Sequence, residues 1–362
     1  MRNIYDKKTK KVIMLHYSQY GKNRSPNNQF DYLRNNDYLK DRFDFITLNQ
    51  DPLPGEIGHI ESIKRLKADI EKVKPDAVHI IGVKEGFHCV IAAFLAGCKK
   101  RILITHGFAG LSGALSAKKR FFYRWIIEPV TLLLSTKVQC NSEFSKSRQM
   151  IRLFAKRKST VIYNFLEPFE INTDCAWRES HGIGADDFLV VTIGNMYSGK
   201  GYDVLEKVIR HYENDANVKF VIIGDGPLKE SFDRQNCTEQ NKSKVFSLGK
   251  LSHDDSMKIL SEADVFYLPT RFETLGMVFA EAGYCSVPSI GTNVGAVPEI
   301  VKDGESGFLV EKDDYKAAVE KIEVLRNDRK LCSSMGIRAK KHIENMFSAQ
   351  DAAERIEDLY NE

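Results

Sequence analysis

The sequence lacks any apolar run long enough to span a membrane. One of its longest is VIAAFLAG at residues 90–97, whereas a membrane-spanning helix needs about 20 consecutive apolar residues. The N-terminal stretch MRNIYDKKTKK is polar and charged throughout, which differs from the apolar core of a secretory signal. We therefore expect a cytoplasmic protein, with contact to a membrane only from the inner surface.

Cysteine is scarce, and its spacing excludes two kinds of small scaffold. The seven cysteines are odd in number and no two are spaced as CxxC. Neither a disulfide framework nor a zinc site is therefore expected, and the protein is expected to be reduced. No pair of carboxylates that could bind a metal follows an expected strand, and no strand is followed by the GxGxxG pattern that opens a dinucleotide-binding helix.

The basic residues are concentrated in the first half of the chain. Residues 1–168 contain 30 Lys and Arg against 15 Asp and Glu, whereas the remaining residues contain 23 and 34. This division favours an anionic partner for the first half, such as a membrane surface or an anionic acceptor, although mutual attraction of two domains would also account for it. None of the usual nucleic-acid recognition modules is present, so no nucleic-acid partner is expected.

Short apolar runs alternate with helical patterns along the chain. Apolar residues recur at helical spacing in 60–74 and 202–214. Expected strands lie at 10–17, 43–49, 76–82, 101–107, 137–143, 159–165, 188–195, 218–227, 243–250, 264–270, 285–292 and 307–310. Strands that alternate with helices predict parallel sheets. Because the rhythm breaks at 166–186 and then restarts, we expect an α/β protein of two doubly wound, Rossmann-like units.

Residues 117–134, AKKRFFYRWIIEPVTLLL, interleave basic and aromatic side chains on an expected helix. This pattern suits the interface of an anionic membrane, where basic residues meet headgroups and aromatic rings enter the boundary. An ordinary helix with one core face and one solvated face is the alternative interpretation. Together with the basic first half, the segment favours peripheral contact with an anionic membrane surface.

The stretch RFETLGMVFAEAG places Glu273 and Glu281 at the ends of a mostly apolar run. A buried carboxylate is unfavourable unless it is paired or hydrogen-bonded. The preceding strand ends near Pro269 and a helix is expected to begin at 274–276, at the edge of a parallel sheet where ligands bind. A helix N-terminus suits a phosphate, and carboxylates suit paired hydroxyls. A nucleotide sugar offers both groups.

Four segments occur once each in the second half, and their combination, order and spacing are specific for a family although each segment alone is a weak signal. They are IGNMYSGKG (193–201), VIIGDGPLKE (221–230), SLGKLSHDD (247–255) and the two glutamates with SVPSIGTNVGAVPEIVKDGESGFLV (286–310) behind them. The chain thereby resembles the retaining glycosyltransferases of family 4, also called glycosyl transferases group 1. In the first half, PDAVHIIG, RILITHG, VQCNSEFSK and VIYNFLE follow the same order more faintly.

The resemblance implies the GT-B fold, in which two Rossmann-like domains face each other across a cleft. The first domain, residues 1–168, would bind the acceptor, and the second, residues 169–347, would bind the nucleotide sugar. A helix at 348–362, whose apolar residues form one stripe, would cross back to the first domain.

The resemblance also implies roles for individual residues. Lys200, Glu273 and His106 would be catalytic: Lys200 neutralises the donor diphosphate, Glu273 holds sugar hydroxyls, and His106 faces the sugar or its phosphate. The donor would be bound by Gly194, Asn195, Lys250, Leu251, Thr274, Leu275, Gly276, Met277 and Glu281, with Glu281 on the ribose and the backbone of Lys250 and Leu251 on the base.

Two positions depart from the family's pattern. Asn195 stands where the family often has an arginine, and asparagine brings no charge to the diphosphate. The first loop, residues 18–30, contains Gly21 alone where the family commonly has paired glycines, so Gly21 is the weaker candidate for the acceptor or phosphate. Gly291 and Gly295 are expected to let the backbone approach a ligand closely.

The implied activity is transfer of a sugar, with retention, from a nucleotide-sugar donor to a hydroxyl of a glycan or lipid-linked acceptor. The donor is expected to be a UDP-sugar and the context bacterial surface polysaccharide synthesis. No cofactor and no metal are expected, because Lys200 and the helix N-terminus would stabilise the diphosphate. The alternatives are a GT-B epimerase or hydrolase of the nucleotide sugar, and a non-catalytic subunit of a glycan-assembly complex, for which Asn195 leaves room. A nicotinamide-dependent dehydrogenase is disfavoured by the missing GxGxxG.

Overall fold

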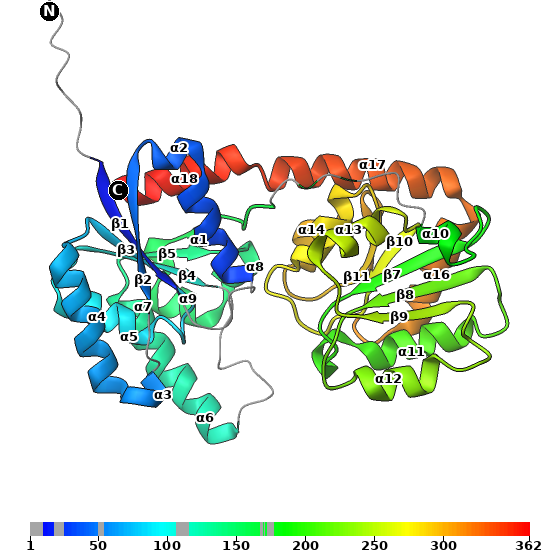
Figure 1. The fold of residues 1–362 in the computed structure, drawn as a ribbon, viewed down its shortest axis with the longest axis horizontal. Helices are drawn as coiled ribbons and strands as arrows, with labels where there is room; N and C mark the ends of the chain where they lie inside the picture. The colour runs from blue at the N-terminus through cyan, green and yellow to red at the C-terminus, as the bar shows by residue number, and fades with distance from the viewer. Residues whose placement is uncertain are drawn as a thin grey trace, which may run out of the picture. The chain divides into compact units, whose positions relative to one another are not determined.

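The structure is a computed structural model that describes residues 10–17, 25–49, 54–105, 116–166, 169, 171 and 177–362. The chain divides into two units, one formed by Met1–Phe165 with Ala349–Glu362 and the other by Leu166–Ser348. Each unit is built on one six-stranded sheet in which neighbouring strands are parallel (Figure 1). The expected α/β class with two doubly wound units is confirmed.

The sheet of the first unit has the strand order β2-β1-β3-β4-β5-β6. Its strands are β1 Lys11–Tyr17, β2 Phe43–Asn49, β3 Ala77–Ile81, β4 Lys100–Thr105, β5 Lys137–Cys140 and β6 Ser159–Val161. Five of them lie within the runs expected from the sequence, and β4 begins one residue before the run expected at 101–107. Every residue of β3 is buried, as is typical of a parallel strand with helices on both faces.

Helices cover both faces of this sheet. They are α1 Ser25–Asn35, α2 Asp37–Lys40, α3 Pro54–Ile57, α4 His59–Val73, α5 Phe87–Leu95, α6 Ala117–Phe122, α7 Glu128–Leu134, α8 Glu143–Ser147, α9 Gln149–Phe154 and α18 Ala349–Asn361. A π-helical turn, η2 Tyr123–Ile127, joins α6 to α7, and a 3-10 turn, η3 Lys156–Lys158, precedes β6. One core contains residues of α4, α5, α7 and α9, and the other contains residues of α1, α2 and α18.

The last helix, α18, belongs to the first unit (Figure 1). Its apolar stripe includes Ile356 and the fully buried Tyr360, whose hydroxyl lies 2.7 Å from Nδ1 of His79 on β3. The Lys100 side chain donates a 2.7 Å hydrogen bond to the carbonyl of Tyr360. Helix α18 is therefore anchored by apolar burial and by polar contacts with β3 and β4.

The sheet of the second unit has the strand order β12-β11-β10-β7-β8-β9. Its strands are β7 Phe188–Ile193, β8 Val218–Ile223, β9 Val245–Gly249, β10 Val265–Leu268, β11 Ser289–Thr292 and β12 Gly307–Val310. Its helices are α10 Trp177–Ser180, α11 Tyr202–His211, α12 Lys229–Asn236, α13 His253–Ser261, α14 Met277–Tyr284, α15 Val297–Ile300, α16 Tyr315–Asn327 and α17 Arg329–Met346, with a 3-10 turn, η4, at Ser198–Lys200. This is the strand order of the dinucleotide-binding Rossmann fold.

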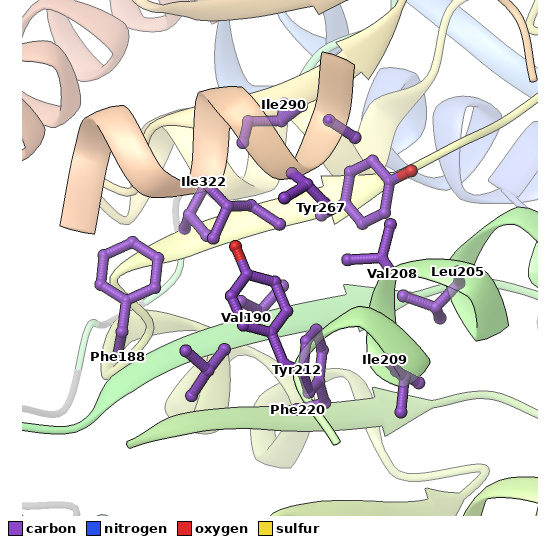
Figure 2. Close-up of a cluster of buried hydrophobic side chains, with 14 of the residues drawn as sticks. Phe188, Val190, Leu205, Val208, Ile209, Tyr212, Phe220, Tyr267, Ile290 and Ile322 are labelled. Carbon is purple, nitrogen blue, oxygen red and sulfur yellow. The ribbon is translucent and has the colours of Figure 1, made fainter. Parts of the chain in front are cut away.

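The core of the second unit packs helices α11 and α16 against the strands (Figure 2). Phe188, Val190 and Phe220 come from β7 and β8, and Ile322 reaches them from α16. Within this cluster the Tyr212 hydroxyl donates a 2.8 Å hydrogen bond to Glu323, which satisfies its polar end. The close-packed core holds the strands in register and so fixes the loops at their carboxyl ends.

Candidate functional site

The strand order of the second unit reverses between β10 and β7. The connections that follow these two neighbouring strands leave the same edge of the sheet in opposite directions, and such a switch point is where open α/β sheets bind ligands. Gly194, Asn195 and Lys200 follow β7, and residues 274–277 follow β10. Most of the residues predicted from the sequence to bind the donor lie in these two connections.

Lys200 and Glu273 meet at this switch point. The Lys200 ammonium group donates a hydrogen bond to Oε1 of Glu273 and forms an ion pair with it. Their side chains are only 14% and 12% exposed, so each charge offsets the desolvation of the other. The structure thus brings together two of the three residues expected to be catalytic. The third, His106, and the acceptor-loop candidate Gly21 lie outside the described residues.

Helix α14 begins at Met277, with Gly276 as its N-cap residue. The expected start at 274–276 is therefore close to the observed one. Glycine has no side chain that could accept hydrogen bonds from the first turn, so no side chain caps this end of the helix. The Phe279 N–H donates a 2.9 Å hydrogen bond to the Gly276 carbonyl, and the earlier N–H groups of the turn face the sheet edge, where a helix N-terminus suits an anion. Leu275 is buried beneath the connection and anchors it.

Gly295 packs directly against the backbone of Glu273. Its φ is +59°, and a Cβ atom at this position would lie 1.9 Å from the Glu273 carbonyl oxygen. The neighbouring Ala296 N–H donates a 3.2 Å hydrogen bond to the same oxygen. A Cβ on Gly291 would meet the side chains of Val297 and Phe279, while the approach of a ligand to Gly291 and Gly295 stays a prediction. Both glycines allow close packing within the protein.

The GDGP turn after β8 is more than a simple reversal of the chain. A Cβ on Gly224 would lie 1.9 Å from the carbonyl oxygen of Gly194. The Met196 N–H donates a 2.8 Å hydrogen bond to the carbonyl of Asp225, and the Leu228 N–H donates a 3.0 Å bond to the carbonyl of Met196. The turn therefore fixes the backbone on both sides of Asn195, whose own side chain is exposed.

Glu281 pairs with His253, which the sequence did not single out. Nε2 of His253, at the start of α13, lies 3.4 Å from Oε1 of Glu281. The hydrogen bond to Glu281 raises the pKa of His253 above its ordinary value. Because only Ser252, the N-cap residue of α13, separates Lys250 and Leu251 from the helix, this contact brings the expected ribose carboxylate close to the expected base-binding loop. The only signal in the sequence was the position of His253 two residues after Leu251.

This contact predicts a pH-dependent contribution to stability. A group whose pKa is raised by folding stabilises the fold below its unfolded pKa, about 6.5 for histidine, and that contribution disappears as the pH rises through the folded value. We expect Glu281→Gln to return the pKa of His253 toward its ordinary value, as measured by NMR titration of the imidazole. The variant should lower the melting temperature more at about pH 5.5 than at about pH 8.5. An equal loss at both values would contradict the assignment.

Comparison with known proteins agrees with this geometry. The family model described as glycosyl transferases group 1 matches residues 174–342. The capsular polysaccharide biosynthesis glycosyltransferase CapM of Staphylococcus aureus is 29% identical over 332 residues, which cover 84% of this chain and 85% of that protein. An uncharacterized glycosyltransferase of Methanocaldococcus jannaschii is 30% identical over 261 residues, which cover 72% of this chain and 68% of that protein.

Solved structures share the fold at low sequence identity. HepE of Anabaena, in complex with UDP and glucose, superposes with a TM-score of 0.76 at 16% identity, over 96% of this chain and 98% of that one. Sucrose-phosphate synthase of Thermosynechococcus elongatus gives a TM-score of 0.78 at 16% identity, over 97% and 98%. The two Rossmann-like units and the matched segments therefore lead to one conclusion: the chain has the GT-B fold and belongs to the glycosyl transferases group 1 family of glycosyltransferases.

Proposed function

We propose that the protein transfers a sugar from a UDP-sugar, with retention of configuration, to a hydroxyl of a glycan or lipid-linked acceptor in surface polysaccharide synthesis. The observation that carries this proposal is the pairing of Lys200 with Glu273 beside the N-terminus of α14, which no side chain caps. A cation and free N–H groups suit a diphosphate, and a carboxylate suits sugar hydroxyls.

Names of relatives support the substrate classes. One relative, 28% identical over 313 residues that cover 84% of this chain and 80% of that protein, is the UDP-Gal:alpha-D-GlcNAc-diphosphoundecaprenol alpha-1,3-galactosyltransferase of Escherichia coli. That name gives the relative a UDP-sugar as donor and a lipid-linked acceptor. The name of CapM refers to capsular polysaccharide, which agrees with a glycan product.

The chemistry follows from where charge develops during transfer. As the bond from the sugar to the diphosphate breaks, negative charge accumulates on the leaving group. Lys200 and the first N–H groups of α14 would stabilise that charge in a site that is already arranged to receive it. Glu273 would accept hydrogen bonds from sugar hydroxyls, and Glu281 from the ribose. Since Lys200 and the N-terminus of α14 supply the positive charge, the proposal includes no metal ion. Transfer is expected to persist in the presence of a chelator.

The proposed donor can be tested without knowledge of the acceptor. UDP should raise the melting temperature of the protein in a concentration-dependent manner, because a ligand that binds only the folded state stabilises it. NAD at the same concentration should have no effect. Mass spectrometry with UDP-sugars and candidate acceptors then separates transfer from the alternatives, since free sugar as the sole product would indicate a hydrolase. Stabilisation by NAD and not by UDP would contradict the proposal.

We further propose that the first unit contacts an anionic membrane through residues 117–127. Phe121, Phe122, Trp125 and Ile126 all have exposed side chains, although an ordinary surface helix would turn such residues inward. Basic residues alternate with them in this segment, and charge attraction to anionic lipid adds to burial of the rings. Among the helices that the structure describes, none has the length and apolar character needed to cross a bilayer.

Vesicle flotation tests this surface. Vesicles with about 30% phosphatidylglycerol should retain the protein, whereas purely zwitterionic vesicles should not. Replacement of Phe121, Phe122 and Trp125 by serine should abolish retention. Serine at Phe94 and Leu95, which are exposed at the end of α5 in the same unit, is the matched control and should leave retention unchanged. Equal retention of both variants would overturn the proposal.

A further inference from the structure

Arg271 lies two residues before Glu273 in the connection after β10. With Asn195 in the place of a frequent arginine, it is the obvious candidate for a second cation on the diphosphate. The structure gives its guanidinium group other partners. Nη1 and Nη2 donate hydrogen bonds of 2.9 and 2.7 Å to the two carboxylate oxygens of Asp203. Nε donates a 2.7 Å bond to Asp313, and Nη1 also donates a 2.7 Å bond to the carbonyl of Ser198.

These contacts use most of the hydrogen-bonding capacity of the side chain. A guanidinium group has five N–H donors in a fixed planar arrangement, and four hydrogen bonds already leave it. The bonds to Asp203, and then to Asp313, raise the pKa of Arg271, and the bond from Arg271 lowers the pKa of Asp203. A bidentate, charge-assisted pair is among the stronger polar contacts in proteins. The guanidinium group of Arg271 therefore binds Asp203, Asp313 and Ser198 within the protein, and it is not available to bind a phosphate.

The partners of Arg271 lie on both sides of Lys200 in the chain. Ser198 and Gly199 precede Lys200 in the turn η4, and Asp203 follows it in the first turn of α11. The backbone N–H of Arg271 donates a 2.8 Å hydrogen bond to the carbonyl of Gly199. One residue thus holds the turn before Lys200 by two carbonyls and the helix after Lys200 by a carboxylate.

We infer that Arg271 is a positioning residue: it holds the η4 turn against the β10 connection so that the Lys200 ammonium group lies beside Glu273, where a donor diphosphate is stabilised. The inference depends on the proposed function, because Lys200 is assigned to the diphosphate there. The effect of Arg271 on a donor is indirect and passes through the place of Lys200.

A second arginine of the same unit provides a matched control. Arg326 on α16 has a side chain that is 23% exposed, against 25% for Arg271, and it also bridges two carboxylates, Asp215 and Glu323. Neither partner lies next to Lys200 in the chain. Arg271→Gln and Arg326→Gln therefore remove the same group from similar surroundings. Only the first removes side-chain bonds to Ser198 and Asp203, on either side of Lys200, whereas the backbone bond from residue 271 to Gly199 remains.

The test compares these two variants by calorimetry with UDP and by transfer kinetics on folded protein. We expect Arg271→Gln to weaken UDP binding about tenfold and to lower kcat by about 10–10²-fold, because small displacements of a catalytic group are costly. Arg326→Gln should leave both values within about twofold of the wild type, since distant sites act independently. Arg271→Lys keeps the charge but cannot bridge the same partners, so it should recover only part of kcat.

A double-variant cycle separates positioning from general stability. In a Lys200→Met background, Arg271→Gln should cause little further loss of UDP affinity, because the group that it positions is already absent. An equal loss with and without Lys200, or wild-type UDP affinity and kcat in Arg271→Gln, would overturn the inference. If the wild-type protein does not bind UDP at all, the proposed function fails, and this outcome is distinct from a failure of Arg271 alone.

Discussion

Lys200→Met is expected to lower the rate of sugar transfer by about 10²–10³-fold, which is the usual effect of removing one group that stabilises developing charge. Lys200 is held beside the N-terminus of α14 by Glu273 and has little solvent around it. In such a site a charge acts more strongly on a leaving group than it would in water. The measurement is kcat with a UDP-sugar, normalised to folded protein.

Two further variants make this prediction specific. Lys219, at the beginning of β8, is a lysine of similar burial whose ammonium group lies 4.0 Å from Asp187. It is at the opposite end of the strands, so Lys219→Met should leave transfer per folded molecule unchanged. Lys200→Met also leaves Glu273 without its partner, which lowers stability. The double variant with Glu273→Gln should regain stability without regaining transfer. Transfer within threefold of wild type in Lys200→Met would refute the assignment.

The fold could be predicted largely from local patterns. Each strand of both sheets overlaps a run expected from the sequence, and the fully buried β3 and β8 show why: a strand covered on both faces is mostly apolar. Helices α16 and α17 were not predicted. Within α17, Gly336 lies where a Cβ atom would be 1.9 Å from the carbonyl of Ser286. Glycine lowers the local tendency to form a helix, but the close packing of Gly336 against Ser286 requires a residue without a Cβ atom. The helix at this position is therefore set by tertiary packing and not by a local pattern.

The candidate site could be predicted from the sequence only in part. The positions of Lys200, Glu273 and Glu281 could be inferred because they lie in short segments whose order is distinctive. The contacts of Arg271 with Asp203 and Asp313, and of His253 with Glu281, join residues far apart in the chain. Neither has a local pattern, because only the packing of neighbouring loops brings the partners together. Residues that position the site are therefore visible in the structure and not in the sequence.

Gly295→Ala is expected to reduce both stability and transfer, because two separate effects act at this position. An alanine at φ +59° occupies the left-handed region, which costs about 1–2 kcal/mol. The added Cβ would also lie 1.9 Å from the Glu273 carbonyl oxygen, so the connection that carries Glu273 must move. A displacement of about 1 Å in a positioned group can cost about 10²-fold in rate, and we expect a loss of that size in kcat.

Gly304→Ala separates the two effects. Gly304 has a similar φ of +75°, but no atom lies within 4 Å of an added Cβ. The substitution should therefore cost only the backbone term, about 1–2 kcal/mol in the free energy of unfolding, and transfer per folded molecule should remain at the wild-type level. Chemical denaturation and kcat measured on both variants give the comparison. If the two variants lose the same amount of kcat, the contact between Gly295 and the Glu273 backbone does not control the site. If only Gly295→Ala loses transfer, the place of Glu273 depends on a segment that lies beyond β11 in the chain.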